Sequence, residues 1–88
     1  MPDFDEMLFT AHHMARFSEK TEQAAYWMGV EEGLRAGHYG EKWQARGWGE
    51  VPDTEPDPCR RARGMGYRIG ERIGRGEAID PTATAARL

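Results

Sequence analysis

Two ten-residue segments repeat one pattern of glycines, and that pattern limits how their helices can pack. Residues 28–37 read MGVEEGLRAG and residues 65–74 read MGYRIGERIG, 37 positions apart. Residues four apart lie on one face of a helix, so each segment presents a ladder without side chains that another backbone can approach closely. The ladders consist of Gly29, Gly33 and Gly37 and of Gly66, Gly70 and Gly74.

Glycine inside a helix costs about 0.8–1 kcal/mol relative to alanine, so each ladder destabilises its helix by roughly 2–3 kcal/mol. Tight packing of one helix on another would offset that cost. We therefore expect a closely packed helix pair, ladder against ladder. The two ladders meet either within one chain, as in a monomer, or across a homodimer.

The rest of the chain favours a small all-α bundle of three to four helices in a single domain, residues 1–88. Val occurs twice and Ile three times, which argues against a sheet. Charged side chains interrupt both ladders and exclude a membrane span. They include Glu31, Glu32 and Arg35 in the first ladder and Arg68, Glu71 and Arg72 in the second.

The spacing of apolar residues predicts three main helices. Asp3 and Asp57 are the expected N-caps of the first and third, and Gly37 is expected to end the second. The predicted helices cover residues 4–17, residues 19 or 22 to 36, and residues 58–75.

Three segments outside these helices are predicted separately. Residues 50–58 (EVPDTEPDP) hold three prolines and four acids and predict an acidic surface loop. The tail, residues 80–88, is small and polar and is expected to be frayed. A short helix is expected over residues 41–46, with Trp43 and Trp48 covering the open end of the helix pair.

Charge is distributed unevenly along the chain. Residues 1–58 carry a balance of −7 and residues 59–76 a balance of +5, within a net charge of −3. The simpler interpretation is that the basic third helix lies against the acidic half. The alternative is that one of two charged surfaces binds a partner.

The two candidate partner-binding surfaces have opposite charge. Arginines on one face of the third helix suit phosphates or an acidic protein; they are Arg61, Arg68, Arg72 and Arg75. A clustered acidic surface can imitate a nucleic-acid backbone, with nearby tryptophans as hot spots. This second set comprises Glu31, Glu32, Asp53, Glu55, Asp57, Trp43 and Trp48.

No group of residues points to catalysis. His12 and His13 are neighbours that diverge by about 100° on a helix, and no spacing among His12, His13, His38 and Cys59 resembles a zinc site. A nucleophilic Cys59 would need a base and an orienting partner, and the sequence shows neither. We expect a non-enzymatic protein without metal or cofactor, and the single cysteine favours a reducing cytoplasm.

The two Gly-rich helices resemble the ribosome modulation factor family. The residues that carry this resemblance are Gly29-Val30-Glu31-Glu32-Gly33 and Gly66-Tyr67-Arg68-Ile69-Gly70, about a quarter of the chain. The resemblance implies short Gly- and aromatic-rich helices that pack together in a protein that binds the ribosome.

A second resemblance is one of kind rather than of motif. The chain is short, acidic, single-domain and without catalytic residues, and in this it is similar to phage-encoded anti-CRISPR inhibitors. That similarity implies stoichiometric binding to a nucleic-acid-handling complex. We predict an inhibitor that docks on such a complex, for instance a CRISPR surveillance complex, and blocks target DNA binding. The alternative is a ribosome- or RNA-binding regulator that uses the arginine-rich helix, residues 59–75.

Overall fold

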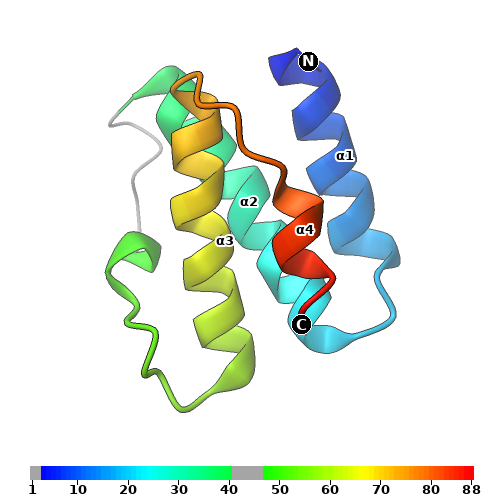
Figure 1. Cartoon of the computed structure of the whole chain (residues 1–88), viewed down its shortest axis with the longest axis vertical. Coiled ribbons are helices and arrows are strands. Elements are labelled where there is room, and N and C mark those ends of the chain that lie inside the picture. The colour runs from blue at the N-terminus through cyan, green and yellow to red at the C-terminus, as the bar shows by residue number, and fades with distance from the viewer. Residues whose placement is uncertain (1–2, 41–46) are drawn as a thin grey trace.

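The computed structural model describes residues 3–40 and 47–88, and it confirms the all-α bundle (Figure 1). The elements of these residues are α1 (Phe4–Phe17), α2 (Thr21–Tyr39), the 3₁₀ helix η2 (Trp48–Glu50), α3 (Pro58–Gly74) and α4 (Pro81–Ala85). The helix predicted over residues 41–46, with Trp43, lies outside the described residues.

Aspartates begin three of the helices. Asp3 accepts a hydrogen bond from the Glu6 amide at 2.8 Å, and Asp57 accepts one from the Cys59 amide at 2.9 Å. These bonds satisfy amide groups that have no partner inside the first helical turn. The predicted starts of the first and third helices are confirmed.

The second helix is longer than predicted. It continues through Gly37 to Tyr39, and Gly40, with a φ of 86°, occupies the terminal position expected for Gly37. Gly37 stays helical because its missing side chain serves packing. A Cβ there would lie 3.1 Å from the Gly74 Cα of α3.

The two glycine ladders meet within one chain, where α2 and α3 run parallel and side by side (Figure 1). A Cβ on Gly33 would lie 2.7 Å from the Glu71 amide nitrogen, and one on Gly70 would lie 2.9 Å from the Val30 Cα. Real Cβ atoms essentially never approach another atom this closely. No side chain fits at either ladder, which explains why glycine stands there.

The contacts between α2 and α3 repeat with the spacing of the sequence motif. The Arg63 carbonyl lies against Gly29, and the Tyr26 carbonyl lies against Gly66. The two glycines are 37 positions apart, as are the two carbonyls. The same offset of 37 positions relates the contacts of Gly33 to those of Gly70, and the contacts of Gly37 to those of Gly74. An approximate two-fold axis along the pair therefore relates α2 to α3.

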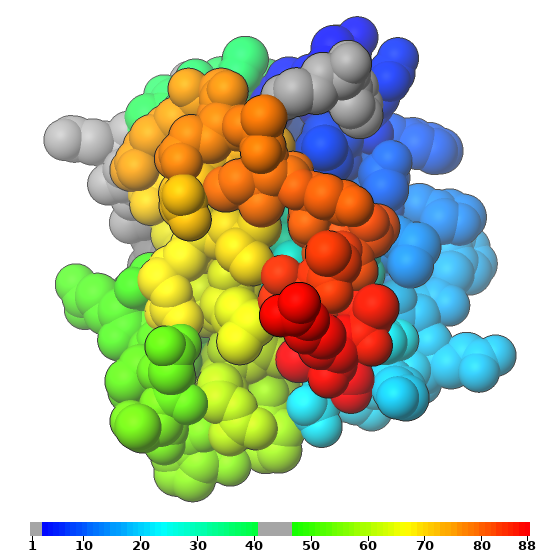
Figure 2. Space-filling view, in the orientation of Figure 1, coloured from blue at the N-terminus to red at the C-terminus, as the bar shows by residue number. Residues whose placement is uncertain are grey.

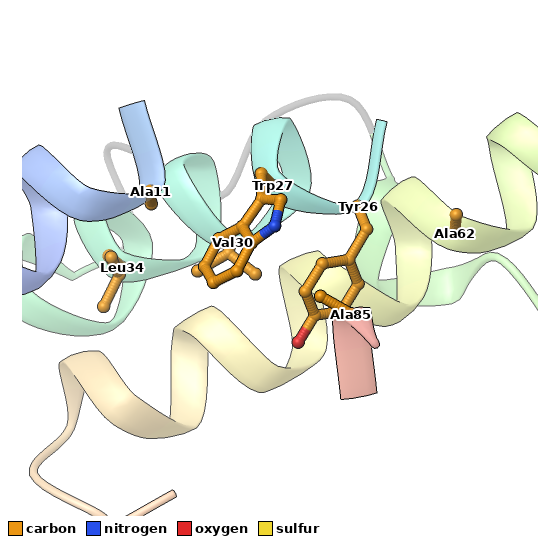
Figure 3. Close-up of a cluster of buried hydrophobic side chains, with 7 residues drawn as sticks. All are labelled: Ala11, Tyr26, Trp27, Val30, Leu34, Ala62 and Ala85. Atoms are coloured by element: carbon orange, nitrogen blue, oxygen red, sulfur yellow. The ribbon is translucent and has the colours of Figure 1, made fainter. Parts of the chain in front are cut away.

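Side chains form the core beside this pair. Tyr26, Trp27, Val30 and Leu34 of α2 are completely buried, and Ala11 of α1 packs against them (Figure 3). α1 runs antiparallel to α2 (Figure 1). It contributes small and flexible apolar side chains to the core, so the α1–α2 contact is made by side chains rather than by backbone.

The C-terminal residues are packed rather than frayed, contrary to the prediction. Pro81 and Ala85 of α4 are buried. The Tyr26 hydroxyl donates to the Pro81 carbonyl at 2.8 Å, and the Gln23 amide donates to the Ala85 carbonyl at 3.1 Å. These two bonds hold α4 on α2, and burial raises the pKa of Tyr26 to about 12.

Candidate functional site

The acidic loop and the arginine face, which the sequence presents as rival surfaces, lie against each other. Arg68 donates to the Val51 carbonyl and, at 2.8 Å, to the Asp53 carboxylate. Arg61 donates to the Glu55 carbonyl at 2.7 Å. The loop therefore follows α3, and its acids neutralise part of the arginine face.

The other arginines of α3 also meet carboxylates. The pairs are Arg60–Glu55 at 3.6 Å, Arg72–Glu77 at 2.8 Å, Arg75–Glu71 at 3.2 Å, and Arg63 with Glu32 of α2. The hydrogen bond from Arg72 holds the pKa of Glu77 below its ordinary value. The interpretation that the basic helix lies against the acidic half is confirmed for Arg60, Arg63 and Arg68, whereas Arg72 and Arg75 pair with Glu77 and Glu71, outside that half.

Trp48 belongs to the same network. The guanidinium of Arg63 lies 4.3 Å from the centre of the Trp48 ring, and that of Arg60 lies 5.6 Å from it. Both distances are within the range of a cation–π contact. Trp48 is thus engaged with α3, whereas Trp43 lies outside the described residues.

Glu31 joins α1 to α2. One of its oxygens lies 2.9 Å from His12 Nδ1 and 2.9 Å from Arg35 Nη1. Burial alone would raise the pKa of Glu31, but the hydrogen bonds from His12 and Arg35 outweigh it and hold the pKa below its ordinary value. Glu31 and Asp57 are both predicted from the sequence to belong to a partner-binding surface. In the structure Glu31 joins two helices and Asp57 caps α3, so both carboxylates support the fold.

The three histidines and Cys59, considered above as possible metal ligands, do not gather into a metal site within the described residues. Across residues 3–40 and 47–88, no three His, Cys, Asp or Glu side chains lie close enough together to hold a metal ion. His13 and His38 have aromatic neighbours instead: Phe17, with ring centres 4.7 Å apart, and Phe4, with ring centres 3.8 Å apart. Cys59 is a half-buried thiol at the start of α3.

The structure adds a surface that the sequence analysis missed, the outer face of α1. Phe9 and Phe17 are 71% and 69% exposed. His13 lies between them, and its ring centre is 6.2 Å from that of Phe9. The three residues are four positions apart and therefore form one line along α1, opposite the buried Ala11. We call Phe9, His13 and Phe17 the α1 aromatic stripe.

Negative charge is in excess around the stripe. Residues 3–22 hold five acids and two basic residues. Glu6 is exposed one helical turn before Phe9, and Glu19 is exposed just beyond Phe17. The α1 face is therefore an exposed aromatic surface that is acidic at the Glu6 end, whereas exposed Arg16 and Lys20 balance Glu19 at the Phe17 end.

Comparison with known proteins found no relative: no protein-family model, curated protein or solved structure matches the chain. Within the described ranges, none of the helices combines the length and apolar composition that a bilayer crossing requires.

Proposed function

We propose that this protein acts by binding a protein partner through the α1 aromatic stripe. The partner belongs to a nucleic-acid-handling complex such as a CRISPR surveillance complex, in the cytoplasm of a bacterial host cell. Binding there inhibits the complex by blocking its nucleic-acid site. The observation that carries the proposal is the exposure of two phenylalanines, Phe9 and Phe17, on one face of one helix.

Exposed aromatic side chains at regular helical spacing favour recognition by a groove. An amphipathic helix that docks in an apolar groove does so through anchors one or two turns apart. Phe9 and Phe17 are two turns apart, and aromatic residues are frequent hot spots in protein interfaces. α1 is already folded and packed on α2 through Ala11 and the His12–Glu31 contact, so docking would order little new backbone.

The charge around the stripe supports the choice of partner. An acidic surface is attracted to a basic one, and this attraction accelerates and orients association. Proteins that hold DNA or RNA present basic grooves to the phosphate backbone. The resemblance in kind to anti-CRISPR inhibitors then names a specific partner to test.

The alternative, a ribosome- or RNA-binding regulator, has less support. It relies on the arginine face of α3, where Arg68 and Arg72 already bind Asp53 and Glu77. Phosphates would have to displace these carboxylates. The alternative predicts RNA binding that weakens steeply with salt and is lost in an Arg68→Glu, Arg72→Glu variant.

The proposal is tested with a purified CRISPR surveillance complex and labelled target DNA. We expect the protein to co-purify with the complex and, in excess, to prevent DNA binding. The Phe9→Ala, Phe17→Ala variant should lose both effects, whereas Met28→Ala, an exposed apolar residue of α2, should retain them. Unimpeded DNA binding at excess protein would refute inhibition of that complex, and full inhibition by the double variant would refute the role of the stripe.

A further inference from the structure

A cleft of about 620 Å³ opens where the bundle ends, separate from the α1 aromatic stripe. Its walls come from three helices: Phe4 and Met7 of α1, Leu34 of α2 and Ile73 of α3. The connection of residues 76–80, orange in Figure 2, passes over this end and adds Ile79. The cleft has the size and apolar lining of a small-molecule site between helices.

The charged residues of the cleft are all of one sign. Among the described residues that line it, Asp3, Glu77 and Asp80 are acidic and none is Lys or Arg. Hydrogen bonds from Thr82 hold the pKa of Asp80 below its ordinary value, as the bond from Arg72 does for Glu77. These two carboxylates are therefore ionised at neutral pH.

The backbone adds to this negative potential. α2 and α3 are parallel, so both C-terminal ends lie at the cleft, and a helix C-terminus carries a partial negative charge. α1 and α4 begin at the cleft with the opposite polarity, but Asp3 and Asp80 already cap those ends. Glu77 is neutralised by Arg72, so the negative charge at the cleft comes from Asp3 and Asp80, and it favours a cation.

One wall of the cleft is aromatic. The rings of Phe4 and His38 stack with centres 3.8 Å apart and planes 13° apart. Such a wall suits both an apolar body and a cationic head, since a ring face attracts positive charge.

We infer that this cleft binds a small amphipathic amine, with its ammonium group at the carboxylates of Asp3 and Asp80 and its apolar body between Phe4, Leu34 and Ile73. An inorganic cation would leave the apolar walls without a partner. An apolar neutral molecule would make no use of the negative charge of Asp3 and Asp80. An amine with a short aliphatic or aromatic body satisfies both parts of the site, and its binding does not depend on the function proposed for the α1 stripe.

The inference is tested with three probes of similar size and different charge: 2-phenylethylamine, 2-phenylethanol and 3-phenylpropionate. Each is titrated into ¹⁵N-labelled protein while amide resonances are followed. We expect the amine to shift the resonances of Ile73 and Ile79 and to bind at least about tenfold more tightly than the carboxylate, which corresponds to about 1.4 kcal/mol. Equal or tighter binding of the carboxylate, or no shift of these resonances with the amine, would overturn the inference.

A pair of isosteric variants separates charge from shape. Asp3→Asn, Asp80→Asn removes the two rim charges while asparagine keeps both helix caps. It should weaken the amine at least about tenfold and leave the neutral alcohol unchanged. Glu19→Gln, Glu50→Gln removes two exposed charges away from the cleft and should leave the amine unchanged. Equal amine affinity in the two variants would contradict an electrostatic site.

Discussion

The two interfaces of α2 are built in opposite ways. Against α3, α2 offers glycines, and backbone meets backbone with no side chain between them. Against α1, it offers Trp27 and Leu34, and side chains interlock in the ordinary manner. The first interface tolerates no added atom. The second adapts to substitution and leaves the far side of α1 available, so the α2–α3 pair serves as the scaffold and α1 presents the candidate binding surface.

The largest loss of stability is expected when one methyl group is added to a glycine ladder. Gly33→Ala or Gly70→Ala should destabilise the protein by about 3 kcal/mol or more, because the new Cβ overlaps the backbone of the facing helix. Intrinsic helix propensity predicts the opposite, a gain of about 1 kcal/mol. Urea denaturation followed by circular dichroism measures the difference.

Gly49→Ala is the matched control for the ladder variants. Its Cβ would meet only the Tyr67 ring, at 3.4 Å, which is ordinary contact. It should therefore unfold within about 0.5 kcal/mol of the parent. Ladder variants that are as stable as Gly49→Ala would mean that α2 and α3 do not pack this closely.

A smaller loss of stability is expected when the hydrogen bond that holds α4 on α2 is removed. Tyr26→Phe removes the donor to the Pro81 carbonyl and should cost about 1–3 kcal/mol, since that acceptor is buried. The folded pKa of Tyr26 is raised from 10.0 to about 12, so its contribution is complete below pH 10 and is lost as pH rises through 12. The parent should lose stability over that window more steeply than Tyr26→Phe, as measured by denaturation between pH 9 and 12.

Gln23→Ala serves as the control for this pH effect, because it removes the other hydrogen bond to α4 without removing a titratable group. It should keep the alkaline loss of the parent. Equal alkaline profiles for the parent and Tyr26→Phe would contradict the assigned role of the Tyr26 hydroxyl.

The ion pair between α1 and α2 should contribute less. Glu31→Gln weakens the bonds to His12 and Arg35 and should cost roughly 0.5–1 kcal/mol at neutral pH. The folded pKa of Glu31 lies below its ordinary value of 4.5, so this contribution is present above that value and lost as pH falls through the folded pKa. Parent and variant should converge in acid denaturation, and a gap that persists at low pH would exclude the ionised pair as its source.

The smallest effect on stability is expected on the outer face of α1. Phe9→Ala, Phe17→Ala removes two largely exposed side chains and should change stability by less than about 0.5 kcal/mol per site. The same variant is expected to lose partner binding. A large drop in melting temperature would instead identify these phenylalanines as part of the core.

The glycine pairing was predictable from sequence because helical spacing and the cost of glycine demand a facing backbone. The parallel direction of α2 and α3 was not predictable, since the ladders fit equally well across two chains. The tail was predicted incorrectly because Tyr26 donates to a backbone carbonyl, Pro81, which has no sequence signature. The stripe could have been predicted, because the apolar spacing that includes Ala11 places Phe9 and Phe17 on the opposite side of the first helix.

The central claim is that the two ladders close within one chain. Light scattering over a range of concentrations tests it directly, on the parent and on Phe9→Ala, Phe17→Ala, which removes any association through the stripe. We predict that this variant is a monomer at every concentration, with a mass slightly below the 10.0 kDa of the parent chain. A dimer that persists in the variant, and that dissociates or unfolds when Gly33→Ala is added, would show that the ladders meet between chains.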